Sequence, residues 1–181
     1  MARILGYIAA SLDGFIADPD ESLDWLFAAE ADLGAHHYDL FLERIRTIVM
    51  GRTTYDWMVR ADTPWPYGEQ RVIVVTSRPI AEPPAAVETR TDIDALVAEL
   101  RALDDGDVWM LGGGRLQMAF MERGALDELE IYIASAIVGG GYPLFPPTGL
   151  RATPELVSAK SLGTGMARLH YRFDRSPRAA G

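Results

Sequence analysis

The feature that most constrains this chain is a regular alternation between short apolar runs rich in β-branched residues and longer helical patterns. The clearest helical pattern covers residues 92–103, with Thr91 as a possible N-cap and Gly106 as a stop. Further helices are expected at residues 32–44, just after Gly51, and between Gly114 and Gly124. The runs predicted to be strands are residues 4–10, 47–50, 71–76, 107–111, 128–138 and 167–173. Strands that alternate with helices predict an α/β sheet with parallel strands, covered on both faces.

The last third of the chain departs from this alternation. No helical pattern separates residues 128–138 from the apolar segment 156–173, so we expect an antiparallel pair added at the edge of the sheet. A length of 181 residues favours one domain, which we expect to span residues 1–175. Residues 176–181 are expected to form a frayed tail.

Charge and composition exclude several classes of protein. Acidic residues outnumber basic ones, 26 against 17, so the formal net charge is −9. Nucleic acids and anionic membranes require clustered basic residues, so we expect neither as a partner. The absence of cysteine excludes disulfides, catalytic thiols and cysteine zinc sites. The uncharged stretch 131–150 is broken by glycines and prolines, and no targeting segment is visible, so a cytoplasmic protein is expected.

The strongest chemical signal is a strand pattern that runs into Gly112, Gly113 and Gly114 and then into a helical pattern. Glycine lets a phosphate approach the backbone, and the N–H groups of a helix N-terminus bind anions. A tight turn would need only one glycine, so three in a row indicate phosphate contact. Gln117 stands where the standard dinucleotide fingerprint has its last glycine, so an ordinary Rossmann site is not indicated.

Two further strand patterns also end in small or cationic residues. Gly51, Arg52, Thr53 and Thr54 come at the end of the strand pattern 47–50. Thr76, Ser77 and Arg78 come at the end of the pattern 71–76. Arginine can clamp a phosphate, and threonine can cap a helix. Because the carboxyl ends of parallel strands share one edge of a sheet, the three segments together predict a single anion-binding edge.

These segments resemble, in order and spacing, the dihydrofolate reductase superfamily, and more closely its branch similar to the reductase domain of the riboflavin-pathway deaminase-reductase. The motifs are Ile8-Ala9-Ala10, Met50-Gly51-Arg52-Thr53-Thr54, Thr76-Ser77-Arg78-Pro79 and Leu111-Gly112-Gly113-Gly114-Arg115, with residues 11–17, 127–129 and 139–145 typical of the branch. The resemblance covers about residues 3–173. It implies a three-layer α/β sandwich with a mostly parallel central sheet, an antiparallel C-terminal edge and helices on both faces.

The same resemblance implies NADPH as the cofactor. It assigns the adenosine 2′-phosphate side to Gly51, Arg52, Thr53, Thr54, Thr76, Ser77 and Arg78, and the pyrophosphate to Gly112, Gly113 and Gly114 with the flanking Leu111 and Arg115. It places Ala9, Ala10 and Ile16 beside the nicotinamide, with Asp13 at the start of the loop over it. Arginines near one phosphate site favour NADPH over NADH.

The residues on the substrate side are less well determined. Hydride transfer to a pterin-like or pyrimidine ring needs a proton source and a group that orients the ring. In true dihydrofolate reductases a carboxylate on the first helix orients it, but ungapped counting back from Gly51 puts Ala35 there. Asp24 and Asp32 are the alternative catalytic residues. A three-residue insertion relative to the dihydrofolate reductases would bring Asp32 to the position of the carboxylate. If neither is catalytic, each would be a helix N-cap. Trp25 is the expected stacking residue.

We therefore expect an NADPH-dependent oxidoreductase that reduces a small heterocycle, pterin-like or similar to a riboflavin precursor. Ala35 motivates the alternative, a nucleotide-binding protein of the same fold without turnover. No metal is expected, because His36 and His37 are consecutive and cannot chelate one ion from a single helix face. The apolar segment 130–138 is expected to pack against a second copy in a homodimer.

Overall fold

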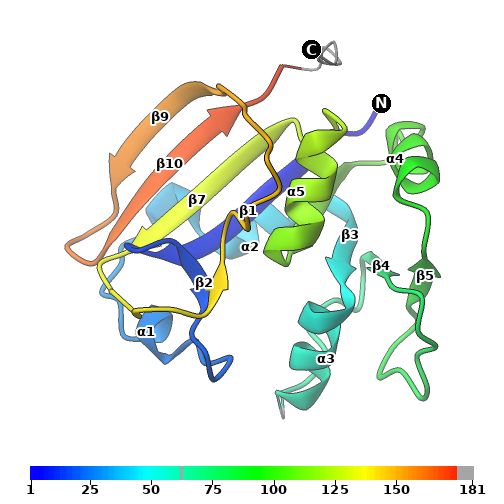
Figure 1. Ribbon diagram of the computed structural model, residues 1–181, viewed down its shortest axis with the longest axis horizontal. Helices are drawn as coiled ribbons and strands as arrows, with labels where there is room; N and C mark the ends of the chain where they lie inside the picture. The colour runs from blue at the N-terminus through cyan, green and yellow to red at the C-terminus, as the bar shows by residue number, and fades with distance from the viewer. Residues whose placement is uncertain (62, 175–181) are drawn as a thin grey trace.

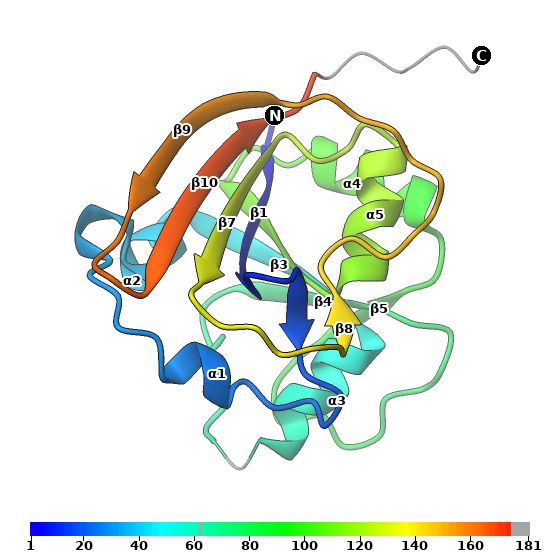
Figure 2. The same cartoon turned by 60° about the vertical axis from the view of Figure 1, so that its left-hand side comes forward.

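An eight-stranded sheet forms the centre of the computed structural model, which describes residues 1–61 and 63–174. Its strand order is β5-β4-β3-β6-β1-β7-β10-β9 (Figures 1 and 2). The strands are β1 (Ile4–Ser11), β3 (Ile45–Gly51), β4 (Arg71–Val75), β5 (Glu88–Arg90), β6 (Asp107–Gly112), β7 (Glu128–Ala134), β9 (Glu155–Ser161) and β10 (Met166–Arg172). Neighbours from β5 to β7 run parallel, whereas β10 is antiparallel to both β7 and β9.

Helices cover both faces of this sheet because successive strand residues point to opposite sides. On β1, Leu5 packs in a cluster that includes Phe41 of α2 (Tyr38–Leu42) and Tyr55 of α3 (Arg52–Arg60). Its neighbour Ile4 packs in a second cluster with side chains of α4 (Ile93–Arg101) and α5 (Gly114–Glu122). The predicted three-layer α/β sandwich with an antiparallel C-terminal edge is therefore confirmed.

The predicted helix over residues 32–44 is wrong. Gly34 has a φ of +47°, and His37 adopts an extended backbone with φ −60° and ψ 141°. These two residues divide the segment into a short 3₁₀ turn, η1 (Gly34–His36), and the five-residue α2. The short helix α1 (Asp24–Phe27) and the ribbon formed by β2 (Phe15–Ala17) with β8 (Tyr142–Pro143) were not predicted.

Two boundaries also differ from the sequence prediction. Asp92, not Thr91, caps α4, because its side chain accepts a hydrogen bond of 3.0 Å from the backbone N–H of Ala95. The strand predicted to end at residue 138 ends at Ala134, and it lies between β1 and β10. Both of its edges are thus paired within the chain, and the homodimer through this segment stays a prediction. The expected tail at residues 176–181 lies outside the described residues.

Candidate functional site

The three strand ends singled out in the sequence meet at one edge of the sheet. Strands β4, β3 and β6 are parallel neighbours, so residues 76–78, 51–54 and 111–115 follow their carboxyl ends side by side. A Cβ atom added to Gly51 would lie 3.8 Å from the carbonyl oxygen of Gly112. One added to Gly113 would lie 3.6 Å from Oγ1 of Thr54. We call these three segments the glycine edge.

The three consecutive glycines of this edge differ in whether the fold requires glycine at their positions. Gly112 has a φ of +136°, a conformation that side-chain-bearing residues rarely adopt. Gly114 lies against the end of β8, and an added Cβ would approach the carbonyl oxygen of Pro143 to 2.5 Å. Gly113 has neither constraint: its φ is −77°, and an added Cβ would make only ordinary contacts. The fold therefore requires Gly112 and Gly114, whereas neither a left-handed backbone nor a close contact requires glycine at position 113.

Gly51 and Gly113 occupy equivalent positions at the starts of two helices. Gly51 is the N-cap of α3 and Gly113 the N-cap of α5, both with extended backbone and without a side-chain cap. The first N–H groups of a helix have no partner inside it, and they carry the positive end of the helix dipole. The glycine edge thus brings together two uncapped helix N-termini, an arrangement suited to a phosphate-bearing ligand.

The arginines of the glycine edge differ in how they are used. Nε of Arg52 donates to Asp56 at 2.6 Å, and its Nη1 donates to the carbonyl oxygens of Arg78 and Pro79 at 3.2 and 3.0 Å. Arg52 therefore joins α3 to the segment after β4. The side chain of Arg78 is 67% exposed and lies 3.7 Å from Asp56, so its guanidinium remains accessible. Arg115 is exposed on the first turn of α5.

The residues expected beside the nicotinamide border this edge. Ala9 and Ala10 lie near the carboxyl end of β1, and Cδ1 of Ile16 lies 3.9 Å from the Cβ position of Gly113. Asp13 accepts hydrogen bonds from the Ser11 hydroxyl at 2.7 Å and from the backbone N–H of Gly139 at 2.8 Å. The Ser11 bond is the largest of the effects that lower the pKa of Asp13. In this structure Asp13 fixes the turn after β1 to the loop after β7.

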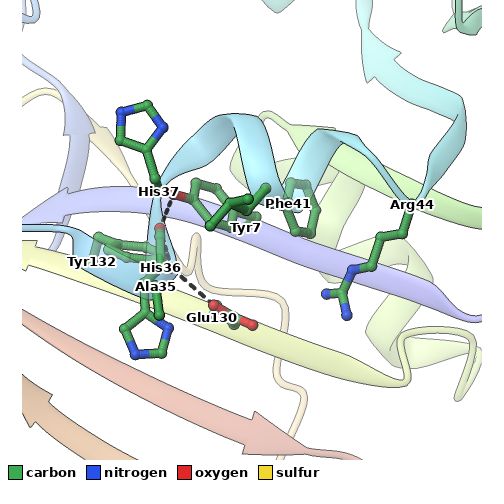
Figure 3. Close-up of a pocket in the computed structure, with 9 residues that line it drawn as sticks. Tyr7, Ala35, His36, His37, Phe41, Arg44, Glu130 and Tyr132 are labelled. Atoms are coloured by element: carbon green, nitrogen blue, oxygen red, sulfur yellow. Dashed lines mark hydrogen bonds between the residues drawn. The ribbon is translucent and has the colours of Figure 1, made fainter.

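Apart from the glycine edge, a hollow lies on the face of the sheet covered by α2 (Figure 3). It has a volume of about 160 Å³, and its lining residues are Tyr7, Ala35, His36, His37, Leu40, Phe41, Arg44, Glu130 and Tyr132. The ring of Tyr7 lies 4.5 Å, centroid to centroid, from both Phe41 and Tyr132. We call this hollow the aromatic pocket. Of these residues, sequence reasoning had considered Ala35, at the position of the ring-orienting carboxylate, and His36 and His37, as a pair that cannot chelate a metal. The others come from separate elements and carry no shared motif.

Glu130 gives the aromatic pocket a charge. Its Oε2 accepts hydrogen bonds from Nε of Arg168 at 2.8 Å and from the Tyr132 hydroxyl at 2.9 Å. The Arg168 and Glu130 side chains are only 7% and 13% exposed. Burial by itself would raise the pKa of Glu130, but the hydrogen bonds from Arg168 and Tyr132 lower it below its ordinary value. Glu130 is therefore a carboxylate at neutral pH.

The histidines beside this pocket point apart. Figure 3 draws the rings of His36 and His37 on opposite sides of the backbone. The His36 carbonyl oxygen accepts a hydrogen bond of 3.2 Å from the Tyr7 hydroxyl. Burial and the nearby charges of Arg168 and Lys160 lower the pKa of His36. In the described part of the chain, no group of three or more acidic, histidine or cysteine side chains is arranged to hold a metal ion.

The structure does not bring the two predicted catalytic carboxylates into the aromatic pocket. Asp24 is exposed at the start of α1, and Asp32 is exposed in the loop before η1, where its N–H donates to the Leu162 carbonyl. Neither lines the pocket. Trp25 is half-buried in a cluster that includes Tyr132, and its indole Nε1 donates to the Ser22 carbonyl at 3.2 Å. Catalytic and stacking roles for these residues stay predictions.

The strand order and the glycine edge define an α/β protein of the dihydrofolate reductase type. Dihydrofolate reductase from Enterococcus faecalis, complexed with NADP(H) and RAB-propyl, shares this fold with a TM-score of 0.64 at 18% identity, over 95% of this chain and 96% of that one. Within this class, the chain belongs to the RibD C-terminal domain family, whose model matches residues 4–168.

Relatives in this family are similar along nearly their whole length. The uncharacterized proteins YwjB and YyaP of Bacillus subtilis (strain 168) are 33% and 27% identical, covering 91% and 95% of this chain and 94% and 95% of their own. A Shewanella sp. PV-4 protein with the provisional name of a riboflavin biosynthesis protein has a TM-score of 0.84 at 27% identity, over 96% of this chain and 99% of its own. No helix among the described residues has the length and apolar character needed to cross a membrane.

Proposed function

We propose that this protein is an NADPH-dependent reductase of a small heterocycle, either pterin-like or similar to a pyrimidine precursor of riboflavin. The observation that carries the proposal is the pair of uncapped helix N-termini at Gly51 and Gly113, at each of which an added Cβ would make only ordinary contacts. Two positive helix ends at neighbouring strand ends suit a pyrophosphate. The Enterococcus faecalis enzyme of the same fold, which is complexed with NADP(H), supports the choice of cofactor.

The residues of the glycine edge fit the parts of this cofactor. The N–H groups at the starts of α3 and α5 would hold the pyrophosphate, with Gly113 leaving room for it. The accessible Arg78, with Thr76 and Ser77, would hold the 2′-phosphate. Arg52 would act mainly by keeping the segment of Arg78 in place through its hydrogen bonds to two carbonyl groups.

The reacting end would lie beside Ala9, Ala10 and Ile16. When bound, the cofactor supplies a hydride from nicotinamide C4. The chain would hold the acceptor ring against β1, next to the nicotinamide. A carboxylate or a water beside the ring would supply the proton. Asp24 and Asp32 remain the proposed carboxylates.

A fluorescence titration tests the cofactor assignment, because the chain has four tryptophans whose emission can report binding. We expect saturable binding of NADPH that is tighter than binding of NADH. Arg78→Ala should weaken NADPH binding by roughly tenfold and leave NADH binding nearly unchanged, because only NADPH has the 2′-phosphate. The matched control is Arg172→Ala, whose exposed side chain pairs with Glu155 on β9. Equal affinity for both dinucleotides would contradict the 2′-phosphate assignment.

Turnover separates the proposed reductase from a protein that only binds nucleotide. NADPH oxidation is followed at fixed enzyme concentration against dihydropterins and aminopyrimidine riboflavin precursors. Saturable NADPH binding with turnover of a ring substrate supports the reductase. The same binding without turnover of any of them favours the nucleotide-binding alternative, and no dinucleotide binding at all would overturn both.

A further inference from the structure

The aromatic pocket contains one acceptor that its own surroundings leave unused. Both hydrogen bonds that Glu130 receives end on Oε2, from Arg168 and Tyr132. Among the described residues, Oε1 receives no hydrogen bond, and it is not sealed from solvent as the orphaned amide of Gln117 is. A carboxylate has about four acceptor positions, so the free oxygen can still accept N–H groups.

The position of this carboxylate is fixed by the fold. Arg168 holds Oε2 through its Nε and donates from Nη1 to the Ser158 hydroxyl at 3.1 Å. The Tyr132 hydroxyl holds the same oxygen from two residues further along β7. A group held in place by two donors loses little conformational freedom when it binds a ligand. Oε1 is therefore a preorganised acceptor.

The walls of the pocket suit a flat ring. Tyr7, Phe41 and Tyr132 supply aromatic surface, and Figure 3 shows Tyr7 between Phe41 and Tyr132, with the Glu130 carboxylate to one side of them. The guanidinium of Arg44 lies 5.2 Å from the Phe41 ring centre, farther along the pocket from His36. A hollow of about 160 Å³ is near the size of one that holds a single six-membered ring.

The location relates the pocket to the glycine edge. Tyr7 and Ala9 are on the same face of β1, two residues apart, so their Cα atoms are about 6.6 Å apart along the strand. Tyr132 lies opposite Ala9 on β7. A larger hollow, about 570 Å³ between α5 and the opposite face of β7 and β10, has no charged residue in its lining. Its lining offers a polar ring the hydroxyl groups of Ser11 and Tyr171 but no fixed charge.

We propose that Glu130 binds the substrate ring: its Oε1 accepts hydrogen bonds from adjacent N–H groups of a planar aminopyrimidine-type heterocycle that lies in the aromatic pocket, against the packed rings of Tyr7, Phe41 and Tyr132. This inference rests on the proposed function and deepens it. The orienting carboxylate then comes from β7, not from the segment of Asp24 and Asp32. Glu130 compensates for Ala35, which lines the same pocket without a functional group.

Two small rings of equal shape test this without any variant. The probes are 2,4-diaminopyrimidine, which offers N–H donors, and 2,4-dimethylpyrimidine, which offers none. Binding is followed by changes in the protein's NMR spectrum in the presence of NADPH. We expect the diamino ring to bind roughly 10- to 100-fold more tightly, because its donors meet a charged acceptor. Equal binding of the two rings, or no binding of either, would overturn the proposal.

A variant then assigns the preference to one residue. Glu130→Gln keeps the shape but removes the charge, and we expect it to abolish most of the preference while leaving NADPH binding intact. The matched control is Glu128→Gln, two residues earlier on β7, whose carboxylate pairs with His170 at 3.0 Å instead. A preference kept in Glu130→Gln would overturn the assignment. If Glu130→Gln does not fold, Glu130→Asp decides, because it keeps the charge but draws the acceptor oxygen back from the ring. The preference should then fall, and an unchanged preference would overturn the assignment.

The outcomes for this site and for the cofactor are separable. Ring binding that depends on Glu130 without any NADPH binding would refute the proposed reductase and leave the ring site standing. NADPH binding and turnover with a ring preference that ignores Glu130 would refute only this inference.

Discussion

The glycine edge and the aromatic pocket are built in opposite ways. The glycine edge consists of three continuous segments at neighbouring strand ends, and its functional groups are mainly backbone N–H groups at two helix starts. The aromatic pocket consists of single side chains from β1, η1, α2 and β7. The glycine edge therefore depends on backbone N–H groups that glycine leaves accessible, whereas the aromatic pocket depends on contacts between side chains.

The largest expected effect comes from breaking the ion pair behind the aromatic pocket. Arg168→Met leaves Glu130 buried without its cation, and we expect a loss of about 3 kcal/mol in the free energy of unfolding. Arg172→Met, four residues further along β10, removes an exposed pair with Glu155 and should cost at most about 1 kcal/mol. Urea unfolding monitored by circular dichroism measures both. Similar losses of unfolding free energy in the two variants would show that the buried ion pair behind the pocket contributes no more to stability than an exposed one.

The next effect separates two adjacent glycines of the glycine edge. Gly114→Ala places a Cβ 2.5 Å from the Pro143 carbonyl oxygen, and we expect it to destabilise the protein by about 1–3 kcal/mol. Gly113→Ala has room and should unfold at nearly the wild-type denaturant concentration. Its methyl group would instead occupy the proposed pyrophosphate space and weaken NADPH binding by roughly tenfold or more. Unfolding curves and NADPH titrations on both variants provide the test, and an unaltered NADPH affinity in Gly113→Ala contradicts the assignment.

The two regions also differ in how far the sequence alone reveals them. Strand alternation and the turn residues Gly51 and Gly112 are local signals, so the sheet and the glycine edge could be predicted from them. The aromatic pocket unites Tyr7 with Tyr132 and Glu130, which are more than a hundred residues away in the chain. On β7, Glu130 reads as one polar position of an alternating strand, and only the packing of α2 and β10 makes it a buried carboxylate.

The failed helix at residues 32–44 has a related cause. The apolar spacing there fits a helix, but Gly34 takes a left-handed backbone and His37 an extended one. The side chain of His37 caps α2 by accepting from the Asp39 N–H at 3.3 Å. Such a break depends on how the segment packs over Tyr7, which periodicity does not report.

Arg52 is expected to have a smaller and less selective effect than Arg78. Its guanidinium is occupied by Asp56 and by the carbonyl groups of Arg78 and Pro79. Arg52→Ala should therefore loosen the segment after β4 and weaken NADPH and NADH by similar factors, roughly three- to tenfold. The ratio of the two dissociation constants is the readout. A selective loss of NADPH in this variant would mean that Arg52 contacts the 2′-phosphate directly, and the division of labour between the two arginines would be wrong.

The smallest expected effect concerns Asp13, which belongs to neither region and joins the turn after β1 to the loop after β7. Hydrogen bonds from Ser11 and from the N–H groups of Gly139 and Val138 lower its pKa below the ordinary value of 3.8. A carboxyl with a depressed folded-state pKa adds stability above its unfolded pKa, and that stability is lost as the pH falls through the folded value. Asp13→Asn should lower the Tm by no more than about 2 °C at pH 7, and the difference should diminish as the pH falls below 3.8. The control is Asp20→Asn, which makes the same charge change at an exposed position and should show no such convergence. Parallel Tm curves for Asp13→Asn and wild type across this pH range would mean that Asp13 does not hold the turn through its charge.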